Sequence, residues 1–155
     1  MYNILLVYKQ LLLQFDENGQ LLSFPEDEQI THVLSYDEKP GIQATANTTE
    51  DFPPDENHKI ISRDYEYKRL GTVSLLAGID LQTGETIPLV RDRHSSKAYI
   101  EFLQLLDSKY PKGDKIRLVR LVLDNLQMHT SKETRKYLAS ISGRFEFIST
   151  PKHGS

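Results

Sequence analysis

The stretch LGTVSLLAGIDLQTGETIPLV, residues 70–90, decides the fold. Leu70–Ile79 is an apolar run typical of a buried strand, and Thr86–Val90 is a second, shorter run of strand-forming residues. The polar residues Asp80–Glu85 between them include a glycine and have the composition of a hairpin connection. The sequence therefore predicts two strands that pair antiparallel across a tight turn.

Strands are predicted on both sides of this hairpin. A short alternating run upstream ends abruptly at Asp37–Gly41, and a polar stretch over residues 43–62 then predicts a long loop. The strands outside the hairpin are predicted at Ile30–Tyr36, Ile116–Leu123 and Phe145–Ile148.

Helices are predicted where apolar residues recur with helical spacing. They cover residues 3–15, Ser96–Lys109 and a segment ending near Ser140. Thr130 with Glu133 fits a capping box that opens the last of these helices. With the strands, this order predicts an α/β fold: a mixed five-stranded sheet, antiparallel first and then parallel, with helices on its faces.

The length of 155 residues predicts one domain over residues 1–155, in which residues 1–29 form an N-terminal helix and a connector leading into the core. The chain has no cysteine. This excludes disulfide scaffolds, thiolate zinc sites and cysteine nucleophiles.

No membrane partner is expected. The most apolar stretch, residues 4–13, is broken by Lys9 and Gln10 and is too short to cross a bilayer. It also lacks the basic start and small-residue cleavage site of a signal peptide, so the expected location is the cytoplasm.

Charge is unevenly distributed along the chain. Residues 1–62 contain three Lys or Arg and eleven Asp or Glu, whereas residues 63–155 contain sixteen and eleven. A basic half can bind a polyanion, and it can equally be an ordinary solvated surface.

Two aspartates follow predicted strands, Asp37 after the first and Asp124 after the fourth. If these strands are neighbours, the two carboxylates form a site for a hard cation such as Mg²⁺ or Mn²⁺. Such ions activate water or a hydroxyl for attack at phosphorus. The alternative is that both are ordinary turn residues, since Asp is common where strands end.

A second set of candidates mixes basic and aromatic residues. Tyr65 lies in phase with Arg63 and Arg69 in an extended segment that also contains Lys68. This pattern suits phosphate contacts and base stacking, and it also suits an edge strand with solvated charges. His129, before the last predicted helix, either contacts phosphate or is a surface histidine.

A short repeat, Arg117–Val119 followed by Arg120–Val122, lies in the fourth predicted strand. A three-residue insertion exchanges the two faces of a strand. We therefore expect either a looped-out copy near Lys115 or a bulge.

Several motifs in order resemble the DDE domain of bacterial insertion-sequence transposases, in the branch related to Tc/mariner elements. The matching segments are SYDEKPGIQA (35–44), RDYEYKRLGTVSLLAGIDLQTGE (63–85), LVLDN (121–125), HTSKET (129–134) and GRFEFISTPKHGS (143–155). The resemblance extends from about Val7 to the last residue.

The resemblance implies a ribonuclease H-like fold and a catalytic triad of acids that binds two divalent metals. The first two acids match Asp37 and Asp124. The implied reaction is hydrolytic cleavage of DNA at the ends of an insertion sequence, followed by strand transfer into target DNA. The implied partners are the terminal inverted repeats, target DNA, and a second copy of the chain or a full-length transposase.

The chain also departs from the family pattern. The third acid lies on a helix beyond the motif that here is TPKHGS, residues 150–155, so we expect a truncated domain with its final catalytic helix missing and little or no activity. The N-terminal region that recognises element ends is likewise expected to be missing. Two alternatives stay open: a non-catalytic remnant that regulates by binding DNA or transposase, and another ribonuclease H-like nuclease.

Overall fold

The structure is a computed structural model. It describes residues 2–12, 14–20, 22, 30–57, 59–61, 65–113, 116–124 and 131–150.

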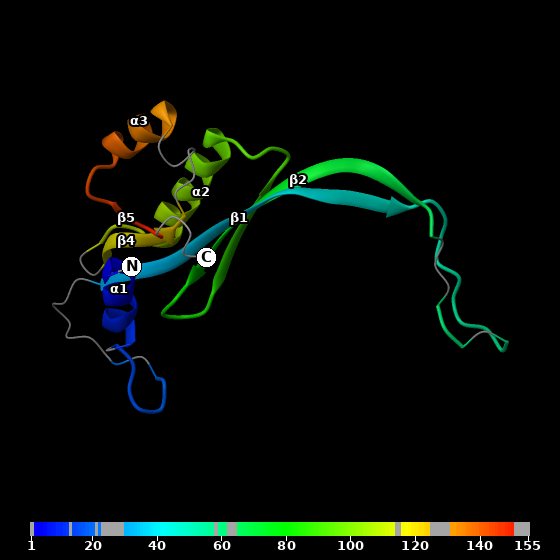
Figure 1. Ribbon diagram of the computed structural model, residues 1–155, viewed down its shortest axis with the longest axis horizontal. Helices are drawn as coiled ribbons and strands as arrows, with labels where there is room; N and C mark the ends of the chain where they lie inside the picture. The colour runs from blue at the N-terminus through cyan, green and yellow to red at the C-terminus, as the bar shows by residue number, and fades with distance from the viewer. Residues whose placement is uncertain are drawn as a thin grey trace.

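The centre of the molecule is a five-stranded sheet in the order β3-β2-β1-β4-β5 (Figure 1). The first three of these strands pair antiparallel, whereas β4 runs parallel to both β1 and β5. The bounds are β1 Ile30–Asn47, β2 Tyr67–Asp80, β3 Thr86–Arg91, β4 Ile116–Leu123 and β5 Phe145–Ser149. The predicted mixed sheet, antiparallel first and then parallel, is confirmed.

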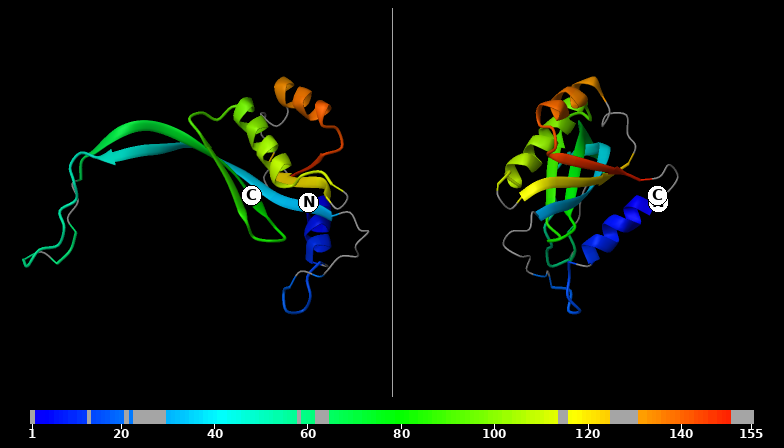
Figure 2. Two further views of the ribbon diagram at one scale, coloured as in Figure 1. Left: turned by 180° about the vertical axis from the view of Figure 1, so that it is seen from behind. Right: turned by 90° about the vertical axis from the view of Figure 1, so that its left-hand side faces the viewer.

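In the part of the chain that the structure describes, three helices flank the sheet: α1 Tyr2–Leu12, α2 Ser96–Lys109 and α3 Lys132–Ser140. Figure 2 shows α2 and α3 on one face and α1 against the other. The prediction for α2 is confirmed at both ends, because Ser95 caps it by accepting a hydrogen bond from the Ala98 N–H. Among the described helices, none combines the length and apolarity needed to cross a membrane.

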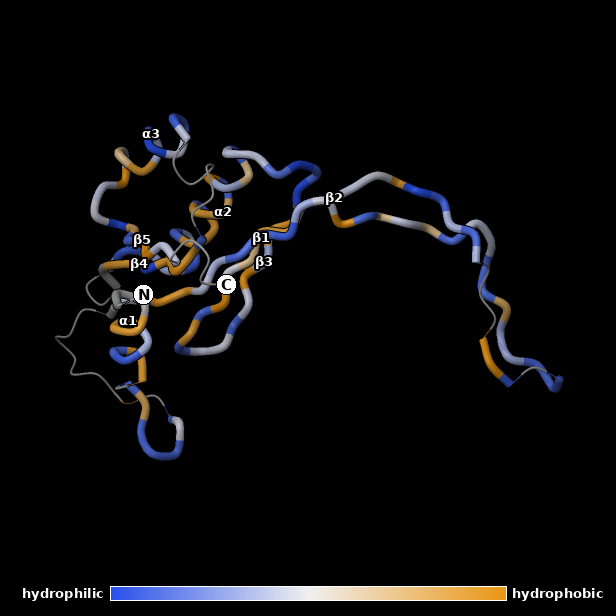
Figure 3. The backbone as a smooth tube through the Cα atoms, in the orientation of Figure 1, coloured by the Kyte–Doolittle hydropathy of each residue, from blue (hydrophilic) through white to orange (hydrophobic). Residues whose placement is uncertain are grey.

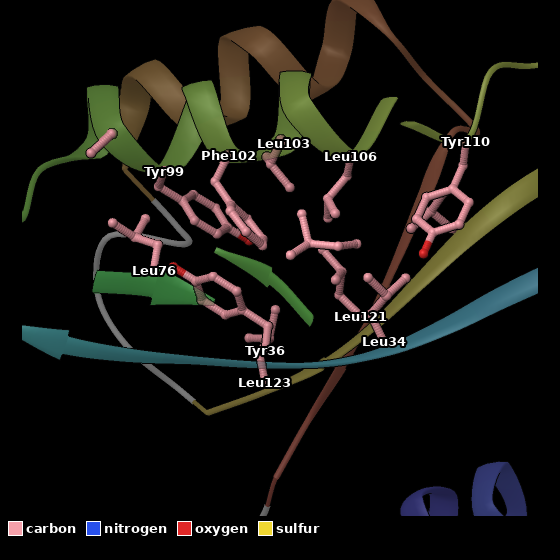
Figure 4. Packing of buried hydrophobic residues seen from close by; sticks show 13 residues of the cluster. Leu34, Tyr36, Leu76, Tyr99, Phe102, Leu103, Leu106, Tyr110, Leu121 and Leu123 are labelled. Carbon is pink, nitrogen blue, oxygen red and sulfur yellow. The ribbon is translucent and has the colours of Figure 1, made fainter. Parts of the chain in front are cut away.

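The larger core lies between α2 and the sheet (Figure 4). Tyr99, Phe102, Leu103 and Leu106 of α2 are completely buried, as the helical spacing requires. They meet side chains from four strands, among them Leu34, Tyr36, Leu76, Ile87, Leu121 and Leu123. This contact fixes which face of β1 and β4 points to α2.

A smaller core lies on the opposite face. Val7 and Leu11 of α1 pack there against Val33 of β1 and Val122 of β4, with Phe15 beside them. The prediction of a helix over residues 3–15 is right in type but too long, since α1 ends at Leu12. Phe15 keeps its apolar contact without being helical.

The long strands β1 and β2 extend beyond the body of the molecule. We call residues 40–57, 59–61 and 65–72 the arm, which projects away from the helices (Figures 1 and 2). Short hydrophobic stretches remain along it (Figure 3). Its large exposed apolar side chains include Phe52, Ile60, Tyr65 and Leu70.

Two features of β1 correct the sequence prediction. The strand does not end at Tyr36 but continues to Asn47, and the register with β2 shifts between Lys39 and Ile42. The shift accommodates Pro40 and Gly41, whose turn-like composition suggested a strand end. Asp37 therefore lies inside a strand, and residues 43–47 belong to that strand and not to the predicted loop.

The prediction for the start of α3 is one residue early. Ser131 is the N-cap, and its hydroxyl oxygen accepts a hydrogen bond from the Thr134 N–H. Because an N-cap bonds the N–H three residues later, Ser131 offers the same chemistry as Thr130 one position further on. Thr130 itself lies outside the described residues.

The Arg-Leu-Val repeat is accommodated by a bulge. Ile30 pairs with Ile116, but Thr31 pairs with Leu118, so Arg117 is passed over in the register between β1 and β4. Lys115, near which the looped-out copy was expected, lies outside the described residues, and the register shift fits the bulge. It restores the pleat after Arg117, so Val119 and Leu121 face the larger core.

Candidate metal and nucleic-acid site

Asp37 and Asp124 lie on neighbouring parallel strands. The register between β1 and β4 ends with Ser35 opposite Val122, and Asp37 and Asp124 each lie two residues beyond that last pair. Adjacent strands lie about 4.8 Å apart, a separation that two carboxylates bridge when they share a divalent ion. The structure thus brings these two predicted residues together.

The two aspartates also share a face of the sheet. Side chains alternate along a strand, and Val33 and Val122 both pack in the smaller core on the α1 face. Asp37 is four residues after Val33 and Asp124 two after Val122, so both belong to this face. Both residues are exposed, which leaves their carboxylates accessible from solvent.

The electrostatics also place Asp124 near β1. Burial raises the pKa of the Tyr36 hydroxyl, Glu38 raises it further, and the charge of Asp124 adds to the effect. Asp37 is held locally, since its Oδ1 accepts a hydrogen bond of 2.8 Å from the Glu38 N–H. Beyond β4, the Thr150 N–H donates to the Leu123 carbonyl at 2.8 Å and secures the strand end before Asp124.

Sequence reasoning missed Glu38. Its side chain is only 1% exposed and points to the α2 face, where its Oε1 accepts a 2.8 Å hydrogen bond from the Tyr36 hydroxyl. Its Oε2 lies 3.5 Å from Nε2 of His94, in the segment before α2. The sequence spacing could have identified Glu38, because Tyr36 and Glu38 are two residues apart and share a face once the strand continues.

The predicted nucleic-acid residues lie elsewhere. Lys68 and Arg69 are exposed on the arm, and Tyr65 is 89% exposed. Asp37 pairs with Ala77. Arg69 is eight residues before Ala77, which at about 3.3 Å per residue is roughly 26 Å along the strand. Arg63 and His129 lie outside the described residues.

Of the predicted site residues that the structure describes, Asp37 and Asp124 lie at the same end of adjacent strands, whereas Tyr65, Lys68 and Arg69 lie on the arm. Within residues described by the structure, no three His, Cys, Asp or Glu side chains form a group that could hold a metal ion. The two aspartates are thus the donor set that the described chain offers at this site.

A second polar cluster lies at the last residue of β2, far from the arm. The carboxylate of Asp80, 1% exposed, accepts hydrogen bonds from the Tyr110 hydroxyl at 2.7 Å and the Gln82 N–H at 2.8 Å, and lies 3.2 Å from His32 Nδ1. Burial alone raises the pKa of Asp80, but these hydrogen bonds and one from the Thr83 N–H outweigh it and lower the pKa to about 2. This cluster ties the β2–β3 turn to the end of α2.

Three solved structures are among those similar to this chain. The simian T-cell lymphotropic virus intasome, in complex with a PP2A regulatory subunit, has a TM-score of 0.46 at 11% identity, over 79% of this chain and 35% of that one. The HTLV-2 integrase catalytic core domain with magnesium has a TM-score of 0.44 at 13% identity, over 76% and 59%. The BIV integrase catalytic core has a TM-score of 0.46 at 8% identity, over 79% and 57%.

This chain thus spans between about a third and three fifths of the length of those chains. No curated protein matches the sequence. Residues 32–155, four fifths of the chain, match the family model of the DDE superfamily endonucleases. The match includes β1 from His32 onward and both aspartates of the candidate site. The chain belongs to the DDE superfamily endonuclease family.

Proposed function

We propose that this chain is the catalytic domain of a bacterial insertion-sequence transposase of the Tc/mariner-related branch. In this proposal the domain cleaves DNA at the ends of the element and transfers the strands to target DNA. The observation that carries it is that Asp37 and Asp124 lie at the same end of adjacent parallel strands and on one face of the sheet. Membership of an endonuclease family supports phosphodiester bonds as the substrate.

The donor set fits a divalent metal. Two exposed carboxylates from adjacent strands are the oxygen ligands that Mg²⁺ and Mn²⁺ prefer, and no sulfur donor competes, since the chain lacks cysteine. Asp37 and Asp124 would hold the ion. When bound, it would supply Lewis-acid activation of the attacking oxygen and stabilise charge on the leaving oxygen.

The other residues act by positioning. The Glu38 N–H holds one carboxylate oxygen of Asp37, so the second oxygen is the one presented outward. Glu38 itself is anchored by Tyr36, which makes this part of β1 rigid. We propose that Arg63, Tyr65, Lys68, Arg69 and His129 contact DNA, the aromatic ring by stacking and the basic groups through phosphates.

We further propose that a polypeptide of these residues has little or no catalytic activity by itself. The family resemblance calls for a third acid, and residues 1–155 contain none that matches it. Phosphoryl transfer depends on how accurately a metal is placed, and two carboxylates place it less accurately than three.

Metal binding is the most direct test of the site. We expect Mn²⁺ to bind the intact chain, as measured by the loss of the free-ion electron paramagnetic resonance signal in a titration. The double variant Asp37→Asn/Asp124→Asn should weaken Mn²⁺ binding by at least tenfold, because each replacement removes a charged ligand (about 1.4 kcal/mol or more in all). Glu17→Gln, at an exposed acid in the 14–20 segment, is the matched control and should bind as the parent does.

A nuclease assay tests the proposed lack of catalytic activity independently of the metal site. With labelled element-end DNA and Mn²⁺, little nicking is expected. Clear metal-dependent nicking that disappears in Asp124→Ala would contradict the proposed inactivity and support the transposase chemistry. Mn²⁺ binding that is unchanged in the double variant would contradict the site itself.

One observation favours a second candidate, a regulatory remnant that binds DNA or a transposase without cutting. The arm exposes large apolar side chains, Phe52 by 64% and Ile60 by 75%, and such surfaces commonly mark interaction sites. Mobility shifts with terminal inverted repeats without cleavage, or co-purification with a full-length transposase or a second copy, would favour this role. Preference for RNA–DNA hybrids would instead favour another ribonuclease H-like nuclease. The cytoplasmic location stays a prediction.

A further inference from the structure

A cavity of about 340 Å³ opens between the end of β3 and the first turn of α2. Its charged lining consists of three cations, Arg91, Arg93 and Lys97, and two acids, Asp92 and Glu101. It shares no residue with the candidate metal site or with the predicted DNA contacts on the arm. Its chemistry depends on which of these charges are already paired.

One cation of the cavity is neutralised by its neighbour. The Arg91 Nε donates to Glu101 Oε2 at 2.6 Å, and its Nη1 donates to the Val90 carbonyl at 2.8 Å. Arg93 and Lys97 are exposed and have no hydrogen bond or ion pair with any residue of the described ranges. Two unpaired cations and a single unpaired acid, Asp92, therefore face the cavity, and this excess of positive charge favours an anionic ligand.

The cavity lies at the same end of the sheet as the aspartate pair. β3 ends at Arg91, opposite Ser74, and the next residue of β2, Leu75, is opposite Lys39 of β1. Lys39 is two residues from Asp37. This end of the sheet is also where the arm leaves the body (Figure 1).

A direct contact connects the strand segment of the aspartate pair with the cavity. The buried Glu38, which follows Asp37, reaches His94 at 3.5 Å, and His94 lies between the cavity residues Arg93 and Ser95. The aspartates face α1 and the cavity faces α2, so a ligand serving both must be extended and pass over this end of the sheet. A DNA strand carries a phosphate about every 3.4 Å, so a few nucleotides span such a path.

We propose that this cavity binds the phosphate backbone of DNA, with Arg93 and Lys97 each contacting a phosphate that flanks the bond held at Asp37 and Asp124. The assignment rests on the proposed function, since DNA is the extended polyanion which that function supplies. Arg93 and Lys97 fix the path of the strand and carry no base specificity, because they contact phosphates alone. Asp92 limits the affinity by opposing the same phosphates.

The test is DNA binding without metal. Fluorescence anisotropy with a short labelled duplex of arbitrary sequence, in EDTA and at several salt concentrations, measures both affinity and its salt dependence. Arg93→Ala/Lys97→Ala should weaken binding several-fold and reduce the slope of log K against log salt by about 2, since each lost phosphate contact removes about one unit. Asp92→Asn should act in the opposite direction and tighten binding.

The matched control removes the same charge elsewhere. Lys9→Ala/Lys112→Ala takes two exposed cations from α1 and from beyond the other end of α2, and should change the slope much less. Equal losses in the two double variants, an unchanged Arg93→Ala/Lys97→Ala variant, or unchanged or weaker binding by Asp92→Asn overturns the cavity assignment. If the parent chain itself fails to bind the duplex, the proposed function is contradicted as well. Failure of the proposed function is therefore distinguished from failure of the cavity assignment alone, in which the parent chain still binds.

Discussion

The two halves of strand β2 are built differently although both pair with β1. Its first six residues, Tyr67–Thr72, are all exposed, whereas from Val73 to Asp80 most residues are buried or half-buried and alternate in depth. The second half lies under α2, where Leu76 is completely buried in the larger core together with Phe102. The first half belongs to the arm and has no helix over it (Figure 2).

The difference shows that strand pairing and burial contribute separately to the stability of the fold. Pairing satisfies the backbone of the arm, but hydrogen bonds exchanged with water contribute little net free energy. Burial under α2 supplies most of the stabilisation, at about 25 cal/mol for each Å² of apolar surface removed from water. We therefore expect the body to determine folding stability and the arm to be available for contacts.

The largest expected effect compares one phenylalanine from each region. Phe102→Ala empties the centre of the larger core and should lower the free energy of unfolding by about 3–5 kcal/mol. Phe52→Ala, at a residue 64% exposed on the arm, should change it by less than about 0.5 kcal/mol. Urea unfolding followed by circular dichroism measures both, and similar losses would show that the arm is part of the cooperative core.

A smaller effect is expected at the body end of β2. Asp80→Asn removes a buried carboxylate whose pKa is lowered to about 2 by its hydrogen bonds. Since an ordinary Asp has a pKa of about 4, the variant should lose about 2 kcal/mol of stability at neutral pH.

The pH dependence gives this prediction its sign. A pKa lowered by folding contributes stability that is present above the unfolded pKa near 4 and is lost as pH falls toward 2. Unfolding free energies measured from pH 7 to pH 2 should therefore converge for parent and variant at the acid end. Glu56→Gln, at an exposed acid on the arm, is the control and should follow the parent throughout. A constant difference at every pH would contradict the role of the Asp80 charge.

The smallest effect concerns space in the core. A Cβ at Gly78 would lie 3.2 Å from Phe102 Cζ and 3.3 Å from Leu34 Cδ2, so Gly78→Ala should cost about 1 kcal/mol through overpacking. Gly113→Ala, where the nearest atom is a backbone oxygen at 4.0 Å, should be close to neutral. Thermal unfolding of the two variants tests this, and an equal or stabilising effect at Gly78 would contradict the tight contact beneath α2.

Local patterns predicted the elements that obey local rules. The apolar stripe of α2 predicted the helix bounds, because helical periodicity involves residues three or four apart. The apolar run ending at Leu123 likewise predicted β4. The Asp37–Gly41 segment misled, because its turn composition says nothing about a partner strand that pairs with residues on both sides of it.

The residues of the candidate site also divide into those that local patterns predicted and those that only the tertiary structure identified. Asp37 and Asp124 were identified from their positions after apolar runs and from the family motifs, and each lies two residues beyond the last pair of the register between β1 and β4. The contact of Glu38 with His94 could not be found from spacing, because it depends on where the β3–α2 segment crosses the end of the sheet. The distance of Lys68 and Arg69 from the aspartates likewise depends on how far β1 continues.

The sequence by itself determined the succession of helices and strands, the absence of thiol chemistry and the two acids, because periodicity, capping and composition act over a few residues. The tertiary structure alone decided that β1 continues as an arm, that Glu38 is buried while Asp37 is exposed, and that Arg93 and Lys97 face a cavity. These properties arise from contacts between residues that are far apart in the chain. Their physical reason is packing: a helix laid over one half of a strand buries that half and leaves the other in water.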